Sequence, residues 1–145
     1  MVTIVNVTDP DTPSLFQLLN QFLLTTGEPP LDSQSINRIK KAIRDQKIYF
    51  YLAMDSGSAV GICSLTMGYT TYHAGYFGVM EDFYIADAMR KKGVARQMIG
   101  KLLQDAKEKG CCSVLLGCSS DDIHMYEHLG FRKIGNMMAI DLPHE

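Results

Sequence analysis

The sequence constrains the fold most strongly between residues 75 and 109, where a strand pattern passes through a short basic loop into a long helix pattern. Gly75 to Ile85 has the composition of a central strand, and Val94 to Lys109 repeats apolar side chains at helical spacing. Gly110 then marks the end of the helix. A strand joined to an amphipathic helix in this way predicts a sheet covered by helices.

The rest of the chain supplies further strands and helices. We expect strands at 3–7, 47–54, 59–67 and 113–116, helices that start at Pro13 and after Asp32, a short helix over 121–129, and one or two last strands within 131–142. Residues 55–58, Asp-Ser-Gly-Ser, read as a hairpin turn. The order predicts a mixed α/β or α+β fold, and 145 residues fit a single domain over 1–145.

Composition excludes several classes of protein. The 14 basic and 16 acidic residues give a net charge of −2, which argues against a nucleic-acid partner. No apolar run approaches the roughly 18 residues of a membrane helix, and the first residues lack a signal-peptide pattern. We therefore expect a cytoplasmic protein with no membrane partner.

The four cysteines are Cys63, Cys111, Cys112 and Cys118, and we expect reduced thiols. A zinc site that adds His124 is a weaker alternative, because the spacing is not one of the usual zinc spacings. A nucleophilic Cys118 is equally weak, since no activating partner stands beside it in the sequence. We expect no metal.

Three cations, Arg90, Lys91 and Lys92, stand just before the long helix. The first turn of a helix has unpaired N–H groups and a partial positive charge, so each cation there costs roughly 0.3–1 kcal/mol. Gly93 and the small Ala95 leave room for an anion to approach the backbone. This pattern predicts a phosphate or pyrophosphate at the start of the helix, and the alternative is a solvated basic turn. Neither a Walker loop nor a G-x-G-x-x-G fingerprint occurs.

Two motifs connect the chain to a known family. Arg90-x-x-Gly93-x-Ala95, after the strand that ends Glu81-Asp82-Phe83-Tyr84-Ile85, resembles the [RQ]-x-x-G-x-[GA] acetyl-CoA motif of the GCN5-related N-acetyltransferases (GNAT). Residues 126–131, Tyr-Glu-His-Leu-Gly-Phe, are similar to the family's Tyr-Glu-x-Leu-Gly-Phe segment. The resemblance covers nearly the whole chain and implies a mixed sheet of six to seven strands flanked by about four helices. The acidic-aromatic run looks most like the diamine and thialysine acetyltransferase branch.

The resemblance implies acetyl-CoA as co-substrate. The pantetheine arm would pair with the backbone of residues 83–85, in an opening between the central strand and the next parallel strand. The pyrophosphate would sit on the N–H groups of residues 91–96. The cofactor-binding residues are then Phe83, Tyr84, Ile85, Arg90, Lys91, Lys92, Gly93, Val94, Ala95, Arg96 and Ser119, the last in place of the family's usual Asn.

The resemblance also implies direct attack of an amine on the thioester. Tyr126 matches the family's general acid, and a phenol with a pKa of about 10 is still protonated at neutral pH. Glu81 is the best candidate for the base, whereas Asp82 should face the other way and anchor structure or substrate. Glu28 is a candidate for attracting a cationic substrate. For each acid the alternative is an ordinary surface or salt-bridged residue.

The function expected from the sequence is thus an acetyl-CoA-dependent N-acetyltransferase that acts on a small-molecule or protein amine. One alternative is a non-catalytic acetyl-CoA-binding module that regulates a partner, and another is a purely structural interaction protein. A homodimer fits the resemblance. The basic face of the second helix, which includes Arg38, Lys40, Lys41 and Arg44, is either solvated or an anion site.

Overall fold

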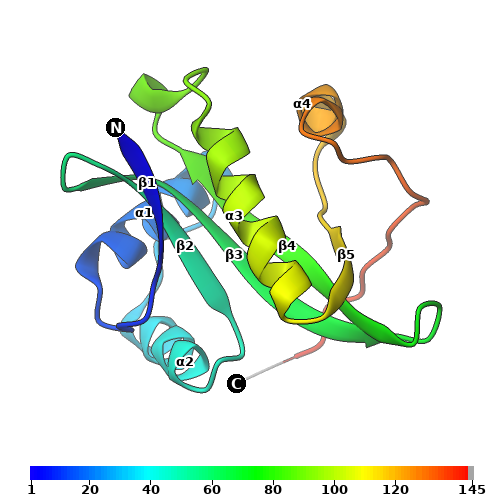
Figure 1. Ribbon diagram of the computed structural model, residues 1–145. Coiled ribbons are helices and arrows are strands. Elements are labelled where there is room, and N and C mark those ends of the chain that lie inside the picture. The colour runs from blue at the N-terminus through cyan, green and yellow to red at the C-terminus, as the bar shows by residue number, and fades with distance from the viewer. Residues whose placement is uncertain (144–145) are drawn as a thin grey trace.

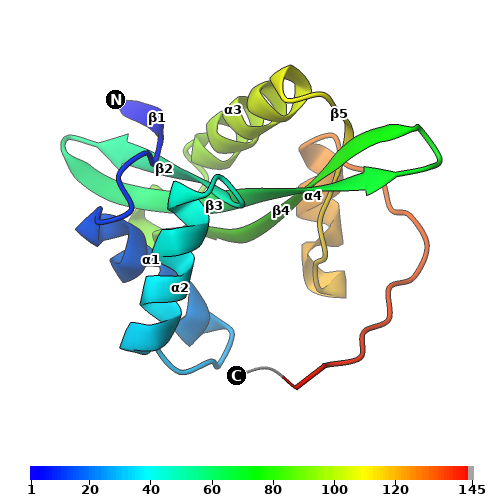
Figure 2. The ribbon, with the colours of Figure 1, turned by 90° about the horizontal axis from the view of Figure 1, so that it is seen from below.

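A single sheet runs through the protein, with α3 on one face and α1 and α2 on the other (Figures 1 and 2). The computed structural model describes residues 1–143. The strands are β1 (Val2–Asn6), β2 (Tyr49–Asp55), β3 (Ser58–Thr70), β4 (Gly75–Ile85) and β5 (Cys111–Leu115). The helices are α1 (Pro13–Thr25), α2 (Ser33–Arg44), α3 (Val94–Glu108) and α4 (Ile123–His128), with short 3₁₀ turns η1 (Asp87–Met89) and η2 (Ser120–Asp122).

The strands lie in chain order, β1-β2-β3-β4-β5. The first four are antiparallel, and only β4 and β5 run parallel, with α3 as the crossover between them. The hairpin predicted at residues 55–58 is confirmed: Ser56 and Gly57 both have positive φ, as the favoured two-residue turn requires.

Alternation along the strands divides the apolar side chains between two cores. The core under α3 contains Tyr51, Ala53, Cys63, Leu65, Met80, Ile85, Val94, Met98, Ile99, Leu102 and Ala106. The core under α1 and α2 contains Leu15, Leu18, Leu19, Ile43, Phe50, Leu52 and Ile62. Adjacent residues of β2 and β3 therefore enter opposite cores, which is the expected pattern for a central sheet buried on both faces.

A buried polar cluster fastens α3 to the sheet. The carboxylate of Asp105, on the sheet-facing side of α3, accepts a hydrogen bond from the Asn6 side chain at 3.0 Å and pairs with Lys101 at 3.4 Å. The hydroxyl of Tyr51, which is fully buried, lies beside it. Burial raises the pKa of Asp105, but Asn6, Tyr51 and Lys101 together lower that pKa below its ordinary value. The ionised carboxylate therefore stabilises the fold.

We predict that Asp105→Ala lowers the free energy of unfolding by about 1–3 kcal/mol, because it removes the acceptor of the Asn6 side chain and the charge that lies beside the buried Tyr51 hydroxyl. Urea unfolding at neutral pH measures this loss, with the exposed Glu108→Ala on the same helix as control. The stabilisation by the wild-type carboxylate is present above its unfolded pKa near 4 and is lost as the pH falls through the lower folded value. Equal effects of the two substitutions would contradict this role.

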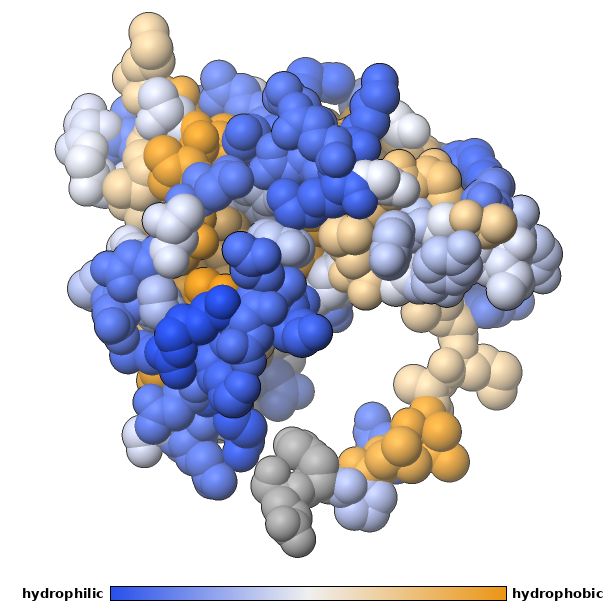
Figure 3. All heavy atoms as spheres, turned by 60° about the horizontal axis from the view of Figure 1, so that its bottom comes forward, coloured by the Kyte–Doolittle hydropathy of each residue, from blue (hydrophilic) through white to orange (hydrophobic). Residues whose placement is uncertain are grey.

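The predicted last strands are absent, so the prediction of six to seven strands is wrong. Five strands are present in residues 1–143, and residues 131–142 belong to no ladder. The apolar side chains that suggested strands there, among them Ile134 and Ile140, are mostly exposed. The pattern is suitable for a strand, but a strand also needs a neighbour to pair with, and Figure 2 shows this segment as an extended stretch that stands apart from the sheet, with open space beside it in Figure 3. No helix in residues 1–143 is long and apolar enough to cross a membrane.

Candidate active site

An opening lies between β4 and β5. The two strands are paired from Tyr76 and Cys111 to Val79 and Leu115, where the ladder ends. β4 continues for six more residues without a partner on that side, up to Ile85. Backbone groups of residues 83–85 that face β5 are therefore not used by a strand there, and they are placed to pair with an extended ligand.

The loop after β4 brings unpaired backbone N–H groups to the same place. Gly93 is the N-cap of α3, and no side chain caps the first turn of that helix. Lys91 and Gly93 have positive φ, 61° and 79°. A Cβ placed on Gly93 would meet nothing within 4 Å, so the space beside it is open. The uncapped turn and the open space are the features that an anion needs.

The side chains of the predicted cofactor loop differ in what they contact. Arg90 donates from Nε to the carbonyl oxygen of Ile85 at 3.1 Å and pairs with Asp87 at 3.2 Å, so it fixes the loop to the end of β4. Lys91 and Lys92 are exposed. Arg96 donates to the carbonyl oxygen of His128 at 3.2 Å and so links α3 to the end of α4.

Ser119 occupies a cap rather than a clear ligand position. Its hydroxyl donates to Asp122 at 3.2 Å, and its carbonyl accepts from the Asp122 N–H at 3.0 Å. The residue therefore starts η2 and orients the approach to α4. Its predicted contact with the pantetheine arm remains a prediction.

Tyr126 faces the end of β4 from α4. Its ring lies 6.2 Å from that of Phe83 and 5.9 Å, edge to face, from that of Phe131. Burial raises the pKa of Tyr126 to about 12, and Asp122, Cys118 and Cys63 add to the shift. The phenol is therefore protonated at any ordinary pH, which is the state that a proton donor requires.

The two acids of β4 do not face opposite ways as predicted, because a bulge interrupts the alternation. The register between β3 and β4 shifts between Ile62 and Ser64, and Asp82 has a φ of 56°. Ser64 pairs with Glu81 and also donates from Oγ to Asp82 at 2.7 Å. Both acids thus belong to the face that Ser64 shares with Ile62, toward α1 and α2.

The environments of the two acids differ. Glu81 is exposed, whereas Asp82 is partly buried. Burial raises the pKa of Asp82, and the hydrogen bond from Ser64 partly opposes this.

Sequence reasoning missed Ser64, since a serine within an apolar strand carries no signal of its own. Ser64 is only 1% exposed, so its hydroxyl needs a hydrogen-bond partner, and Asp82 is that partner.

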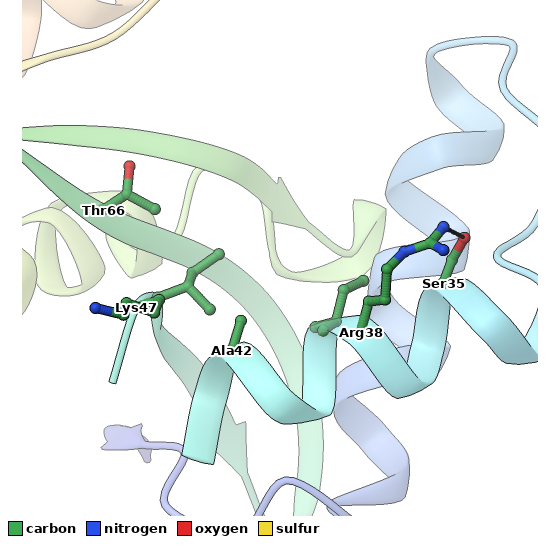
Figure 4. Close-up of a pocket in the computed structure, with 7 residues that line it drawn as sticks. Ser35, Arg38, Ala42, Lys47 and Thr66 are labelled. Atoms are coloured by element: carbon green, nitrogen blue, oxygen red, sulfur yellow. Dashed lines mark hydrogen bonds between the residues drawn. The ribbon is translucent and has the colours of Figure 1, made fainter. Parts of the chain in front are cut away.

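A groove of about 380 Å³ lies on the same face of the sheet, between α2 and β3 (Figure 4). Its floor is apolar, and its rim carries Arg38 and Lys47, with Arg38 donating to Ser35 at 3.4 Å. Thr66 of β3 also lines the groove. It lies two residues beyond Ser64, and therefore roughly 7 Å farther along the strand. The groove therefore extends the face that holds both acids.

The other candidate residues have no assigned role in this site. Glu28 is exposed in the loop between α1 and α2, and its N–H bonds to the carbonyl of Leu23. The cysteines are free thiols. Burial, and then Asp82, raises the pKa of Cys63 to about 12, which leaves it unreactive. Residues 1–143 contain no group of three metal-ligating side chains.

Known proteins resemble this chain in both sequence and fold. The model of the acetyltransferase (GNAT) family matches residues 12–131. A glucosamine 6-phosphate N-acetyltransferase of Trypanosoma brucei brucei is 29% identical over 120 residues, covering 81% of this chain and 82% of its own. An aminoalkylphosphonate N-acetyltransferase of Salmonella typhimurium is 24% identical over 106 residues, covering 72% of this chain and 66% of its own.

Solved structures agree over the full length. An acetyltransferase of Trypanosoma brucei superposes with a TM-score of 0.79 at 27% identity and covers 98% of this chain and 100% of that one. A predicted acetyltransferase of Clostridium acetobutylicum, solved with acetyl-CoA, has a TM-score of 0.82 at 18% identity and covers 97% and 96%. With the opening in the sheet, the uncapped α3 and the facing tyrosine, these matches show that the chain is an acyltransferase of the GNAT acetyltransferase family.

Proposed function

We propose that this chain transfers the acetyl group of acetyl-CoA directly to the primary amine of a small acceptor that carries a phosphate or phosphonate group. The uncapped start of α3, with open space at Gly93 beside the unpaired end of β4, carries the first part of the proposal. It offers N–H groups to the diphosphate and a strand edge to the pantetheine arm.

The chemistry assigned to the side chains follows from their positions. Glu81 takes the proton of the acceptor ammonium, directly or through a water, and the free amine attacks the thioester carbon. Backbone N–H groups near residues 83–85 stabilise the oxyanion. The C–S bond then breaks, and Tyr126 gives its proton to the departing thiolate. The nitrogen that becomes the amide releases its second proton to water, from which Tyr126 is protonated again. No covalent intermediate with the protein forms, so no cysteine is required.

Two features support an anionic acceptor. The relatives named above act, by their names, on an aminosugar phosphate and on aminoalkylphosphonates. The groove under α2 has cations at its rim and adjoins the face that holds Glu81 and Asp82. An acceptor that places its amine at the acids and its phosphate near Arg38, or near Lys47 at the other end of the groove (Figure 4), would use both features. This supports the anion-site interpretation of the basic α2 face, although Lys40 and Lys41 are paired with Asp11 and Asp45.

Release of free CoA, measured with matched pairs of amines, tests the proposal. Glucosamine 6-phosphate against glucosamine, and 2-aminoethylphosphonate against ethanolamine, isolate the contribution of the anion. We expect kcat/KM to favour the anionic member of at least one pair by about 10–100-fold, the value of one charge-assisted hydrogen bond. Arg38→Ala should remove much of this preference and leave turnover of the uncharged amine unchanged. Equal use of both members in each pair would exclude the anionic acceptor.

Ser64 offers a separate test of Asp82, which we assign to anchoring the acceptor ammonium as a carboxylate. Ser64→Ala removes a donor to that carboxylate and should raise the pKa of Asp82 further. We therefore predict that KM for the acceptor rises at a higher pH than in the wild type as the solution is acidified, while kcat at neutral pH is unchanged. Ser64→Thr keeps the hydroxyl and should restore the profile. Superimposable pH profiles for Ser64→Ala and wild type would exclude the anchor.

A further inference from the structure

The helix that carries Tyr126 is short and lies at the surface. α4 has six residues, Ile123–His128, and none of them is buried. On its apolar side the Tyr126 ring lies 6.2 Å from that of Phe83 and packs against the core under α3. A helix of this length is marginal on its own, so its contacts with other elements decide where the Tyr126 hydroxyl stands.

Arg96 makes a polar contact between α4 and α3. It lies in the first turn of α3 and donates from Nη2 to the carbonyl oxygen of His128, the last residue of α4, at 3.2 Å. The three carbonyls before that of His128 accept from backbone N–H groups of residues 129–131. The Arg96 side chain therefore takes up a carbonyl at the end of α4, where helices leave such groups unpaired.

The charge of Arg96 is better suited to α4 than to its own helix. A cation in the first turn of α3 stands at the positive end of that helix, which is unfavourable. The same cation at the C-terminal end of α4 meets the partial negative charge of the second helix, which is favourable. The position is poor for stabilising α3 and good for holding α4.

Arg96 also belongs to the loop and first turn to which we assign the diphosphate. Its backbone N–H is among those of residues 91–96, whereas its side chain ends at the helix of Tyr126. The substitution of the side chain leaves the backbone N–H in place. One residue thus joins the proposed diphosphate site to the helix that carries the proposed acid.

We propose that Arg96 is a positioning residue for proton transfer, which holds the C-terminal end of α4 beside α3 so that the Tyr126 hydroxyl meets the departing thiolate. This inference rests on the proposed function, because it requires Tyr126 as the general acid. Misplacing a reacting group by about 1 Å can cost about 100-fold in rate. A loosened α4 therefore slows the reaction while the cofactor site remains.

Steady-state rates at saturating acetyl-CoA are the first test, with whichever of the four amines named above is used fastest. Arg96→Ala should lower kcat by about tenfold. Arg96→Lys keeps a donor of nearly the same reach and should recover most of the loss. Lys107→Ala removes an exposed cation from the last turn of α3 and should leave kcat unchanged. An unchanged kcat in Arg96→Ala, or a Lys variant as slow as the Ala variant, would overturn the inference.

A double-mutant cycle distinguishes positioning of Tyr126 from a general structural role. In a Tyr126→Phe background the acid is already absent, so adding Arg96→Ala should lower kcat by less than about twofold. If Tyr126→Phe slows the reaction but the two losses multiply, the inference fails and the proposed acid stands. If Tyr126→Phe alone has no effect, the proposed acid fails and the inference fails with it.

Hydrogen exchange of the chain without ligand tests the contact independently of any acceptor. The N–H groups of residues 129–131 bond to carbonyls of α4 and report on how firmly its last turn is held. In Arg96→Ala we expect these amides to exchange about tenfold faster than in the wild type, while amides in the buried middle of α3, such as that of Leu102, keep their rates. Equal rates at residues 129–131 in both proteins would overturn the inference and leave the proposed function untouched.

Discussion

Gly93→Glu is expected to lower the affinity for acetyl-CoA by at least about 100-fold, equivalent to about 2.7 kcal/mol. The new carboxylate would stand in the open space beside the first turn of α3, where the diphosphate is proposed to bind. It would occupy that space and repel the phosphates. Calorimetric titration with acetyl-CoA measures the change, and circular dichroism checks that the variant is folded.

A second substitution separates charge from backbone strain. Gly93 has a φ of 79°, which most side chains adopt only with strain, but Asn tolerates this region better than other residues. Gly93→Asn should therefore stay within about tenfold of the wild-type affinity, since it adds no charge. Retained affinity in Gly93→Glu would place the diphosphate elsewhere. Equal losses in both variants would mean that the loop shape, not the anion, is responsible.

Tyr126→Phe is expected to lower kcat by about 10²–10⁴-fold, the usual contribution of a general acid. The affinity for acetyl-CoA should change little, because the phenol acts on the departing thiolate and the ring contacts with Phe83 and Phe131 remain. Steady-state rates with a responsive amine, together with acetyl-CoA titrations, measure the two quantities separately.

The pH dependence of the rate is a second test of Tyr126 as the general acid. The wild-type rate should rise with pH as the acceptor amine deprotonates, and the fall caused by loss of the Tyr126 proton should come only near pH 12, because its pKa is raised to about that value. A descending limb near pH 8 or 9 would belong to another group. Phe83→Leu is a useful comparison, since it disturbs the ring cluster but keeps the phenol. Unchanged turnover in Tyr126→Phe would remove it as the acid and strengthen the non-catalytic alternative.

Helices, strands and turns could be predicted from the sequence where a local pattern of apolar side chains also forms a buried face. The α3 helix, the 55–58 turn and the start of α2 after Asp32 are confirmed. The structure shows that Asp32 caps α2, because its side chain accepts from the Ser35 N–H at 2.7 Å. Each is specified by side chains close together in sequence. The prediction of last strands was wrong because a strand must pair with a distant edge, and residues 131–142 carry an apolar pattern but pair with neither edge strand of the sheet.

The candidate site likewise has some features that the local sequence predicts and others that it does not. The positive φ at Gly93 and the uncapped start of α3 follow from local sequence, and both agree with the predicted anion site. The orientation of Asp82 does not follow from local sequence, because strict alternation cannot predict a bulge that depends on pairing with β3. Nor could the sequence reveal that Ser64 meets Asp82, or that Arg96 reaches the end of α4, since both contacts join separate elements.

The most direct measurement of the central claim is a crystal structure of the full chain with CoA. The claim predicts the diphosphate on the N–H groups of residues 91–96 and the pantetheine arm along residues 83–85, in the gap where β4 leaves β5, with its sulfur within reach of the Tyr126 hydroxyl. A nucleotide bound elsewhere, with the first turn of α3 occupied by the protein's own side chains, would contradict the claim.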